Sequence, residues 1–265
     1  MASVSLTVHD INVLEKIKDP ESNPLLNVRV DASLPRDPHI TDKAVYERLV
    51  QQEREIVLAI QAVEFQLLGL RPKTEETDPL EQYRRCISRL GDLVAEHPTY
   101  ASARNNRVQA LRRLYGDEML VANGPGHGMR LIADASPDDR RKAAATALDD
   151  LETSVRLLTP SQSGIALSPQ AAKTLSLAHT QRAAIYHATA KIVGSATLDV
   201  EGSRVESTWS KLNFEEAASR DFALGGRYGN EIAKGLAVST NPTAKLCGQM
   251  VREAMKKEYG PDYAV

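Results

Sequence analysis

Apolar side chains recur every three or four residues along most of the chain beyond residue 41, with polar side chains between them. This period gathers the apolar residues on one helix face and predicts amphipathic helices. The longest pattern begins after Thr41 and Asp42, which offer an N-cap. The whole pattern predicts helices over residues 42–68, 79–96, 100–115, 138–158, 169–193, 214–225 and 242–258.

Glycine and proline end these helices in a regular order. Gly69 ends the first helix, and Pro98 follows the second. In the next pair, Gly116 ends the first helix and Pro160 follows the second. Helix, turn, helix and proline thus recur three times, which is typical of an α-α superhelix, or solenoid, built from stacked hairpins. We expect an all-α chain in which residues 41–240 form three repeats, over 42–98, 100–160 and 169–228.

Other segments fall outside this repeating order. Residues 1–40 contain a short amphipathic stretch and several prolines, which favours a partly irregular N-terminal arm. Residues 118–137 and 194–213 lie between the two helices of a hairpin and are polar or contain glycine. We expect them to be surface insertions that are flexible unless something binds them.

Residues 241–265 are expected to form a capping helix and a tail. Asn241 is a candidate N-cap, and Pro242 suits the first helical position. A helix that closes the end of a solenoid buries its apolar face, so we expect inward packing by three large side chains and a buried thiol. These residues are Leu246, Met250, Met255 and Cys247. The alternative is that this helix docks a partner.

Composition narrows the function classes. The 265 residues carry 33 Lys and Arg against 35 Asp and Glu, a net charge of −2, so no basic field points to nucleic acid. No apolar run approaches 18 residues, so we expect no membrane span. The two cysteines are far apart and indicate reduced thiols in a reducing compartment. We expect a cytoplasmic protein, with the nucleus as the alternative.

No motif indicates catalysis or a bound metal. His179 and His187 lie two helical turns apart, too far to share a metal ion. The glycine-containing segment 124–128 lacks the preceding strand and the Gly-Lys-Ser/Thr of a phosphate loop. We therefore expect no metal, no cofactor and no enzymatic activity. The remaining alternative is an enzyme whose catalytic groups converge from distant positions.

The spacing of small and bulky residues within each hairpin resembles a tetratricopeptide repeat. Small residues let two helices approach, and a bulky residue four positions on fills the next gap. Leu90, Leu151 and Phe222 stand at the same bulky position in the three units. Aromatic residues make up only 5% of the chain, which suits thin stacked hairpins.

Four segments resemble the tetratricopeptide repeat protein 36 family more closely. They are Val13–Pro20, Ala101–Arg107, Ala147–Glu152 and Asn241–Cys247. The resemblance covers about residues 11–255, and the two insertions and a longer C-terminal tail depart from it. It implies a non-catalytic adaptor or scaffold that binds a heat-shock-70-type chaperone or a metabolic enzyme and is tied to tyrosine metabolism. It also leaves open a structural factor for cilium-type complexes.

In tetratricopeptide arrays, the first helices of the hairpins line a concave groove that holds a peptide or a partner helix. The register predicts one apolar end and one polar end for this partner-binding groove. The expected lining residues are Ile56, Ile60, Val63, Ser102, Asn105, Asn106, Gln109, Arg113, Gln181, Ala184 and His187. Either the groove is open to a partner, or the N-terminal arm or the C-terminal helix fills its apolar end.

Some arrays hold the C-terminal carboxylates of chaperones with Lys, Asn and Arg side chains from three repeats. Asn105 or Asn106 matches the asparagine of the second repeat. The first repeat offers Ala59, Ile60 and Val63 in place of Lys and Asn, and the third offers Leu177 and Gln181 in place of Lys and Arg. The resemblance therefore predicts an incomplete carboxylate clamp, so a chaperone would need another contact.

Four arginines gather on one helix: Arg104, Arg107, Arg112 and Arg113. We interpret them as internally paired, because Asp149, Asp150 and Glu152 are available in the same repeat. The alternative is a patch that binds an acidic partner. The sequence leaves the oligomeric state open.

Overall fold

A computed structural model describes residues 28–70, 78–122, 130–162 and 165–260. Within these ranges the chain forms helices and no strand, which confirms the all-α fold class. The α-helices are α2 (Lys43–Leu67), α3 (Pro79–Glu96), α4 (Ala101–Tyr115), α5 (Pro137–Leu158), α6 (Pro169–Ile192), α7 (Lys211–Arg227), α8 (Glu231–Thr240) and α9 (Pro242–Tyr259). A 3₁₀ helix, η2 (Val205–Thr208), precedes α7.

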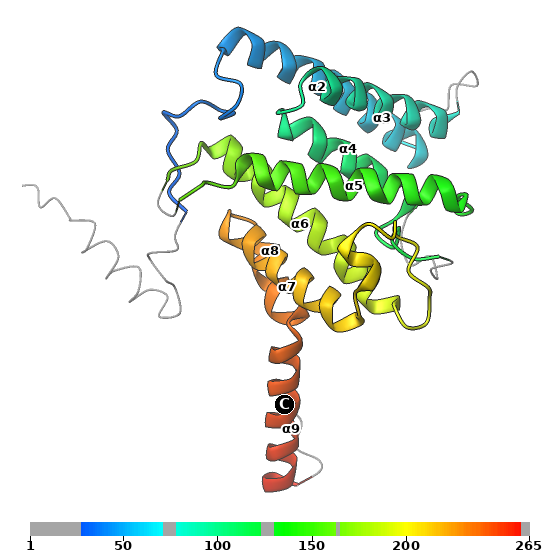
Figure 1. The fold of residues 1–265 in the computed structure, drawn as a ribbon, viewed down its shortest axis with the longest axis vertical. Coiled ribbons are helices and arrows are strands. Elements are labelled where there is room, and N and C mark those ends of the chain that lie inside the picture. The colour runs from blue at the N-terminus through cyan, green and yellow to red at the C-terminus, as the bar shows by residue number, and fades with distance from the viewer. Residues whose placement is uncertain (1–27, 71–77, 123–129, 163–164, 261–265) are drawn as a thin grey trace, which may run out of the picture.

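The helices stack in the order of the chain. Each of the helices α2 to α7 packs against the next one, and α7 packs against α8 (Figure 1). Helix α4 also contacts α6, so the first helices of two neighbouring hairpins lie against each other. This arrangement is an α-α superhelical repeat fold.

Side-chain caps fix the starts of the helices. An Asp, Ser or Asn side chain accepts a backbone N–H of the first turn in most helices, which satisfies one of the donors left free there. These N-caps are Asp42, Asp78, Ser136, Ser168, Ser210, Asn230 and Asn241. The expected N-cap role of Asn241 is thus confirmed.

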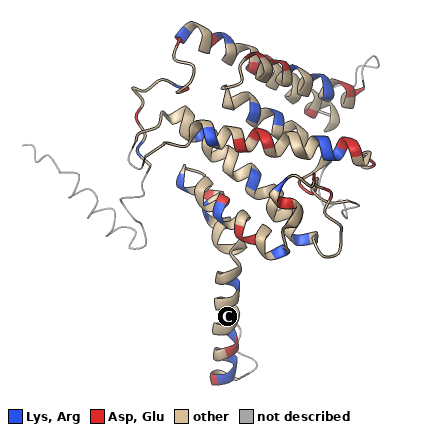
Figure 2. Cartoon of the chain, in the orientation of Figure 1, with Lys and Arg blue, Asp and Glu red and all other residues tan. Residues whose placement is uncertain are grey.

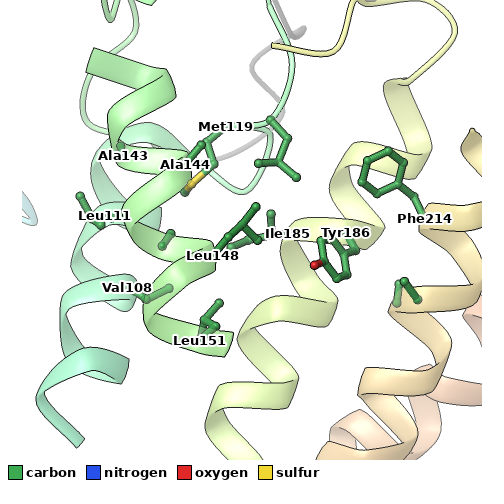
Figure 3. Packing of buried hydrophobic residues seen from close by; sticks show 14 of the residues in the cluster. Val108, Leu111, Met119, Ala143, Ala144, Leu148, Leu151, Ile185, Tyr186 and Phe214 are labelled. Carbon is green, nitrogen blue, oxygen red and sulfur yellow. The ribbon is translucent and has the colours of Figure 1, made fainter. Parts of the chain in front are cut away.

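The main core lies between α4, α5, α6 and α7 (Figure 3). Val108, Leu148 and Ile185 are fully buried there. Small residues allow the helices to approach, and a Cβ added to Gly225 of α7 would lie 2.5 Å from Oγ1 of Thr180 on α6. The small side chains buried at the crossings are Ala143, Ala144, Ala147, Ala178, Ala217 and Ala218.

A buried carboxylate joins the two helices of the second hairpin. Asp150 of α5 is 1% exposed and accepts a 2.7 Å bond from Nη1 of Arg104 and bonds of 2.6 and 2.8 Å from Nε and Nη2 of Arg107. Both arginines come from α4. Such a charge is tolerated in the interior only because it is paired and hydrogen-bonded.

The third hairpin repeats this arrangement at the equivalent positions. Asp221 of α7 is bonded to Nδ1 of His179 at 2.8 Å and to Nε and Nη2 of Arg182 at 2.6 and 2.8 Å. Burial favours a higher pKa for Asp221, but the bonds and charge of Arg182 and His179 outweigh it and hold this pKa below its usual value. We call the two arrangements the aspartate clasps. In the first hairpin the equivalent position holds Arg89, which is exposed.

The four arginines of α4 are paired within the chain. Besides the clasp, Nε of Arg112 lies 2.6 Å from Asp117, and Nε of Arg113 lies 2.8 Å from Glu64 of α2. Acidic and basic side chains are interspersed over the helices (Figure 2). The interpretation of internal pairing is confirmed, although only Asp150 of the three expected acids takes part.

The two insertions are packed against each other, which corrects the expectation of flexible surface loops. The N–H of Ala122 donates to the carbonyl of Thr197 at 2.8 Å, and the N–H of Asp199 donates to the carbonyl of Leu120 at 2.9 Å. Met119, Leu120 and Val121 are at most 1% exposed. These apolar residues place the start of the first insertion in the core. Leu198, Val200 and Trp209 of the second insertion pack against that core, although most of the second insertion stays at the surface.

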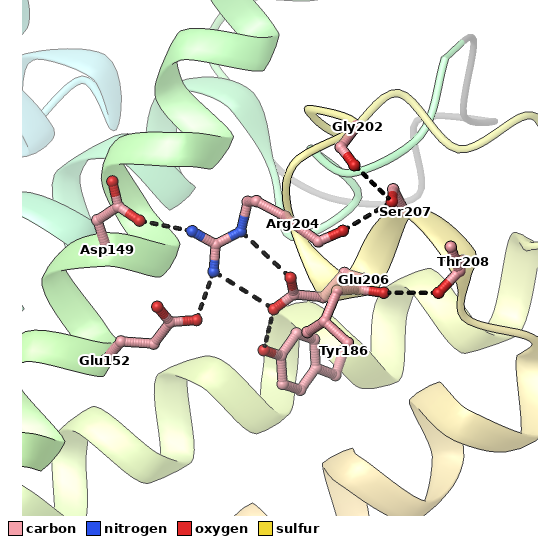
Figure 4. A network of polar contacts seen from close by, with 9 residues as sticks. Asp149, Glu152, Tyr186, Gly202, Arg204, Glu206, Ser207 and Thr208 are labelled. Atoms are coloured by element: carbon pink, nitrogen blue, oxygen red, sulfur yellow. Dashed lines mark hydrogen bonds and ion pairs between the residues drawn. The ribbon is translucent and has the colours of Figure 1, made fainter.

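Arg204 anchors the second insertion to two helices (Figure 4). Its guanidinium reaches Asp149 of α5 at 2.5 Å, Glu152 of α5, and Glu206 of η2 at 3.2 Å. Glu206 in turn accepts a 2.8 Å bond from the hydroxyl of Tyr186 on α6. Asp149 and Glu152, which the sequence also offers to the arginines of α4, therefore pair with the insertion instead.

The described part of the N-terminal arm, residues 28–40, lies along the loop between α5 and α6. The N–H of Asp31 donates to the carbonyl of Leu167, and the N–H of Leu167 donates to the carbonyl of Arg29. Nε2 of His39 lies 2.8 Å from the carbonyl of Leu157. The amphipathic stretch expected at 11–17 lies outside the described residues.

The C-terminal end departs from the expected capping helix. Helix α8, which the pattern did not predict, buries Ala233 and Ala237 against Ala183 and Phe222 and so covers the end of the core. Helix α9 extends away from the body and has no buried residue (Figure 1). The expected inward packing of Leu246, Met250, Met255 and Cys247 is therefore wrong, because α8 already occupies the place of the cap.

In the described part of the chain, no helix is long and apolar enough to cross a membrane.

Replacing Asp150 with alanine leaves two arginines without their buried partner. We expect Asp150→Ala to lower the free energy of unfolding by about 3–5 kcal/mol, measured by urea denaturation. Asp149→Ala is the matched control, because Asp149 is exposed, and a partner of this kind contributes about 0–1 kcal/mol. Equal losses in the two variants would contradict the role of the clasp.

Candidate functional site: a groove between α2 and α4

A groove of about 810 Å³ lies between the first helices of the first two hairpins. One side comes from α2, with Val57, Ile60 and Phe65, and from its C-cap Leu68. The other side comes from α4 and the residues after it. It is lined by Asn106, Gln109, Ala110, Arg112, Arg113, Gly116, Asp117 and Arg130. The groove thus has a mainly apolar side and a mainly polar side.

The residues of α2 reach the groove because this helix is long. It spans 25 residues, and its lining positions, Val57, Ile60, Gln61, Glu64, Phe65 and the C-cap Leu68, recur at helical spacing and so share one face. Leu68 at its C-terminal end is 63% exposed. Large apolar side chains exposed beside a hollow are typical of a surface that binds a partner.

Ion pairs hold the polar side in place. Nε and Nη2 of Arg113 bond to the two carboxylate oxygens of Glu64 at 2.8 and 3.1 Å, which ties α4 to α2 across the groove. Arg112 bonds in the same two-pronged way to Asp117 at 2.6 and 3.0 Å. Among the described residues, Arg130 forms no ion pair and is the one lining arginine left to meet a ligand carboxylate.

A buried glutamate lies below the edge of the groove. Glu53 of α2 accepts a 2.5 Å bond from the hydroxyl of Tyr100 and a 2.7 Å bond from the amide of Asn106. Burial raises the pKa of the Glu53 carboxyl, and the bonds from Tyr100, Ser102 and Asn106 oppose this rise. This contact connects the first hairpin to the second, where the groove lies.

The structure divides the expected groove residues into four sets. Ile60, Asn106, Gln109 and Arg113 line the groove. Ile56 and Val63 are buried in the core between α2 and its neighbours. Asn105 and Gln181 are buried where α4 meets α6, and the amide of Gln181 donates to the backbone carbonyl of Asn105 at 3.2 Å. Ser102, Ala184 and His187 are half-buried and lie outside the lining.

Several lining residues were not expected from the sequence. Phe65 and Leu68 follow Val63, the last residue of α2 that was expected in the groove. Asp117 lies next to the first insertion and Arg130 lies within it. Continuing the apolar spacing of α2 beyond Val63 would have predicted Phe65 and Leu68 as lining residues. No periodic pattern places a loop residue such as Arg130 beside Gly116, so its position depends on the tertiary fold.

No described part of the arm lines this groove, and neither does α9. The residues that a carboxylate clamp would use are engaged elsewhere, since the amide of Asn105 donates to the carbonyl of Thr174 at 2.7 Å and that of Asn106 donates to Glu53. Among the described residues, no three His, Cys, Asp or Glu side chains gather as a metal site would require.

Fold and groove together define an α-α superhelical repeat protein with an open concave surface. The chain is 33% identical to the L-tyrosine degradation gene cluster protein hmgX of Aspergillus fumigatus, over 96% of this chain and 93% of that protein. At this level over nearly the full length of both proteins, the chain belongs to the same family.

More distant relatives carry the name of a repeat family. The tetratricopeptide repeat protein 36 homolog of Drosophila melanogaster is 24% identical over 96% of both chains. That of Drosophila pseudoobscura pseudoobscura is 25% identical over 95% of both. No family model matches the chain, and no solved structure matches it significantly.

A peptide that ends in a chaperone-type carboxylate is expected to bind weakly or not at all. The asparagine amides that would donate to it are already bonded within the chain. Isothermal titration with such a peptide measures this directly. Tight binding that is lost in Asn106→Ala and kept in Gln109→Ala would overturn the expectation.

The raised pKa of Glu53 predicts a pH dependence of stability. Between the unfolded pKa of about 4.3 and the higher native value, the native state binds more protons, so the free energy of unfolding falls as pH rises through this window. Glu53→Gln should remove this fall. Glu55→Gln, on the exposed face of the same helix, is the control and should keep it. The measurement is urea denaturation between pH 4 and 8.

Proposed function

We propose that the protein is a non-catalytic interaction adaptor of the tetratricopeptide repeat protein 36 type that acts in tyrosine breakdown. The observation that carries the proposal is the open groove between α2 and α4, which the described arm and α9 leave uncovered. The full-length relationship to a protein named for a tyrosine degradation gene cluster supports the metabolic context. The similarity to two repeat-protein homologs supports the adaptor class.

The shape and chemistry of the groove suit a peptide segment rather than a small substrate. Its sides are two parallel stretches of helix surface, the arrangement that repeat proteins use to hold an extended segment or a helix. An apolar ligand face would pack on Ile60, Phe65 and Leu68 of α2. A polar ligand face would meet Asn106 and Gln109 of α4.

Charge adds a preference. The groove is lined by three arginines against the carboxylates of Glu64 and Asp117, and those two acids are paired with Arg113 and Arg112. Arg130 remains for the ligand. We therefore propose a partner segment with apolar residues along one side and an acidic residue near the end that meets Arg130, presented by an enzyme of tyrosine catabolism.

Affinity capture tests the proposal. The full chain is immobilised and exposed to a lysate of source cells grown on tyrosine, and captured proteins are identified by mass spectrometry. We expect a tyrosine-catabolic enzyme to be enriched. Leu68→Glu should weaken its binding at least tenfold, or about 1.4 kcal/mol, because a charge is placed against the apolar ligand face.

Leu58→Glu is the matched control. Leu58 is a similarly exposed leucine of α2 that does not line the groove, so its substitution should leave capture unchanged. Equal loss in both variants, or capture that survives Leu68→Glu, would show that the partner binds elsewhere. Turnover of a tyrosine catabolite by the purified chain alone would contradict the non-catalytic assignment.

A further inference from the structure

Among the described helices, α9 is the most exposed, and it does not line the groove. It spans 18 residues, none of them buried, and extends away from the body (Figure 1). Among the described helices its main contacts are with α7 and α8, and the ammonium of Lys245 lies 3.1 Å from Glu215 of α7. The described part of the chain therefore leaves most of the α9 surface open.

The open surface has one apolar half. At 100° per residue, the apolar positions of α9 fall on one half of its circumference, and Gln249, Arg252, Glu253 and Lys256 fall on the other. The apolar half comprises Leu246, Cys247, Met250, Val251, Ala254 and Met255. Leu246, Met250 and Val251 are 57–61% exposed. Such a stripe on a helix outside the core is unfavourable in water unless something covers it.

We infer that α9 pairs with α9 of a second copy of this chain, in antiparallel orientation. The small residues Cys247 and Ala254 stand at the centre of the apolar half, seven positions apart, and allow two helices to approach closely. In an antiparallel pair, Cys247 faces Ala254 of the other copy and Met250 faces Val251. The same layers then recur on both sides of the twofold axis, as an isologous interface requires.

Charge favours antiparallel over parallel pairing. Lys257 and Glu258 lie within the apolar half at the C-terminal end of α9. In a parallel pair each would face its own copy, which places like charges together. In the antiparallel pair Glu258 lies beside the first turn of the other helix, close to the positive end of the helix dipole.

The size of the contact sets the expected strength. An 18-residue helix is about 27 Å long, and pairing two such helices buries on the order of 1,000 Å² in total. This area is at the lower limit for a specific interface, so the dimer should dissociate in the micromolar range.

Sedimentation velocity on the full chain tests the pairing. Between about 1 and 100 µM, the mass should rise from 29.0 kDa toward twice that value. Met250→Glu should remain monomeric at 100 µM, since it places a charge in the apolar layer without touching the core. Gln249→Glu makes the same charge change on the polar half and should dimerise like the unmodified chain.

Disulfide trapping tests the orientation. Under copper-catalysed air oxidation, Ala254→Cys should give covalent dimers through Cys247 of one copy and the new thiol of the other. The unmodified chain should not, because the two Cys247 residues of an antiparallel pair are about 10 Å apart along the helix axis, beyond disulfide reach. Equal trapping of the unmodified chain would overturn the antiparallel orientation.

Three outcomes would overturn the pairing itself. The unmodified chain could be monomeric at 100 µM and bind nothing. It could be monomeric and dimerise only after removal of residues 1–27, which would make that segment the occupant of α9. It could be monomeric and co-sediment with vesicles of anionic phospholipid, which would make a membrane surface the occupant.

Discussion

The buried aspartate clasps are the contacts on which the rest of the structure depends. Asp150 and Asp221 each join the second helix of a hairpin to two basic side chains of the first, at equivalent positions of two repeats. A buried carboxylate is unfavourable unless all of its partners are in place, so each clasp permits only one register of its two helices. The neighbouring helices pack against each clasped pair, so their positions depend on the register of that pair. The first hairpin has Arg89 at this position and is tied to the second through Glu53 and Tyr100 instead.

This difference between repeats determines where a partner could bind. In the second and third hairpins, the first helices touch each other, and Asn105 and Gln181 fill the contact. Between the first and second hairpins, α2 and α4 are joined by ion pairs between long side chains, such as Arg113 and Glu64. These side chains span the space between the two helices. The groove opens there and closes toward α6. An ion pair can bridge a hollow that apolar side chains would have to fill, so the groove keeps its shape without a ligand.

The insertions consolidate the other side of the molecule. Backbone bonds join residues 118–122 to 194–199, and Arg140 and Arg141 of α5 both reach Asp199. Arg204 then connects the second insertion to α5, and Glu206 of η2 connects it to Tyr186 of α6. The two insertions thus form one connected structure that supports α5 and α6 on that side. The groove lies beside this support, and Arg130 of the first insertion lines the groove.

The sequence by itself determined the helices other than α8, because caps, prolines and apolar spacing are local signals. It placed α3 and α5 within one residue of their observed ends, and it identified four of the residues that line the groove. Tertiary structure decided what those signals could not. A short helix rich in small residues, α8, took the capping place that apolar spacing had assigned to α9. Polar or glycine-containing sequence predicts flexible insertions, whereas burial of Met119 and Leu120 and the ion pairs of Asp199 hold the described parts in place. These outcomes depend on contacts between residues far apart in the chain, and a periodic pattern carries no information about which distant surface a residue will meet.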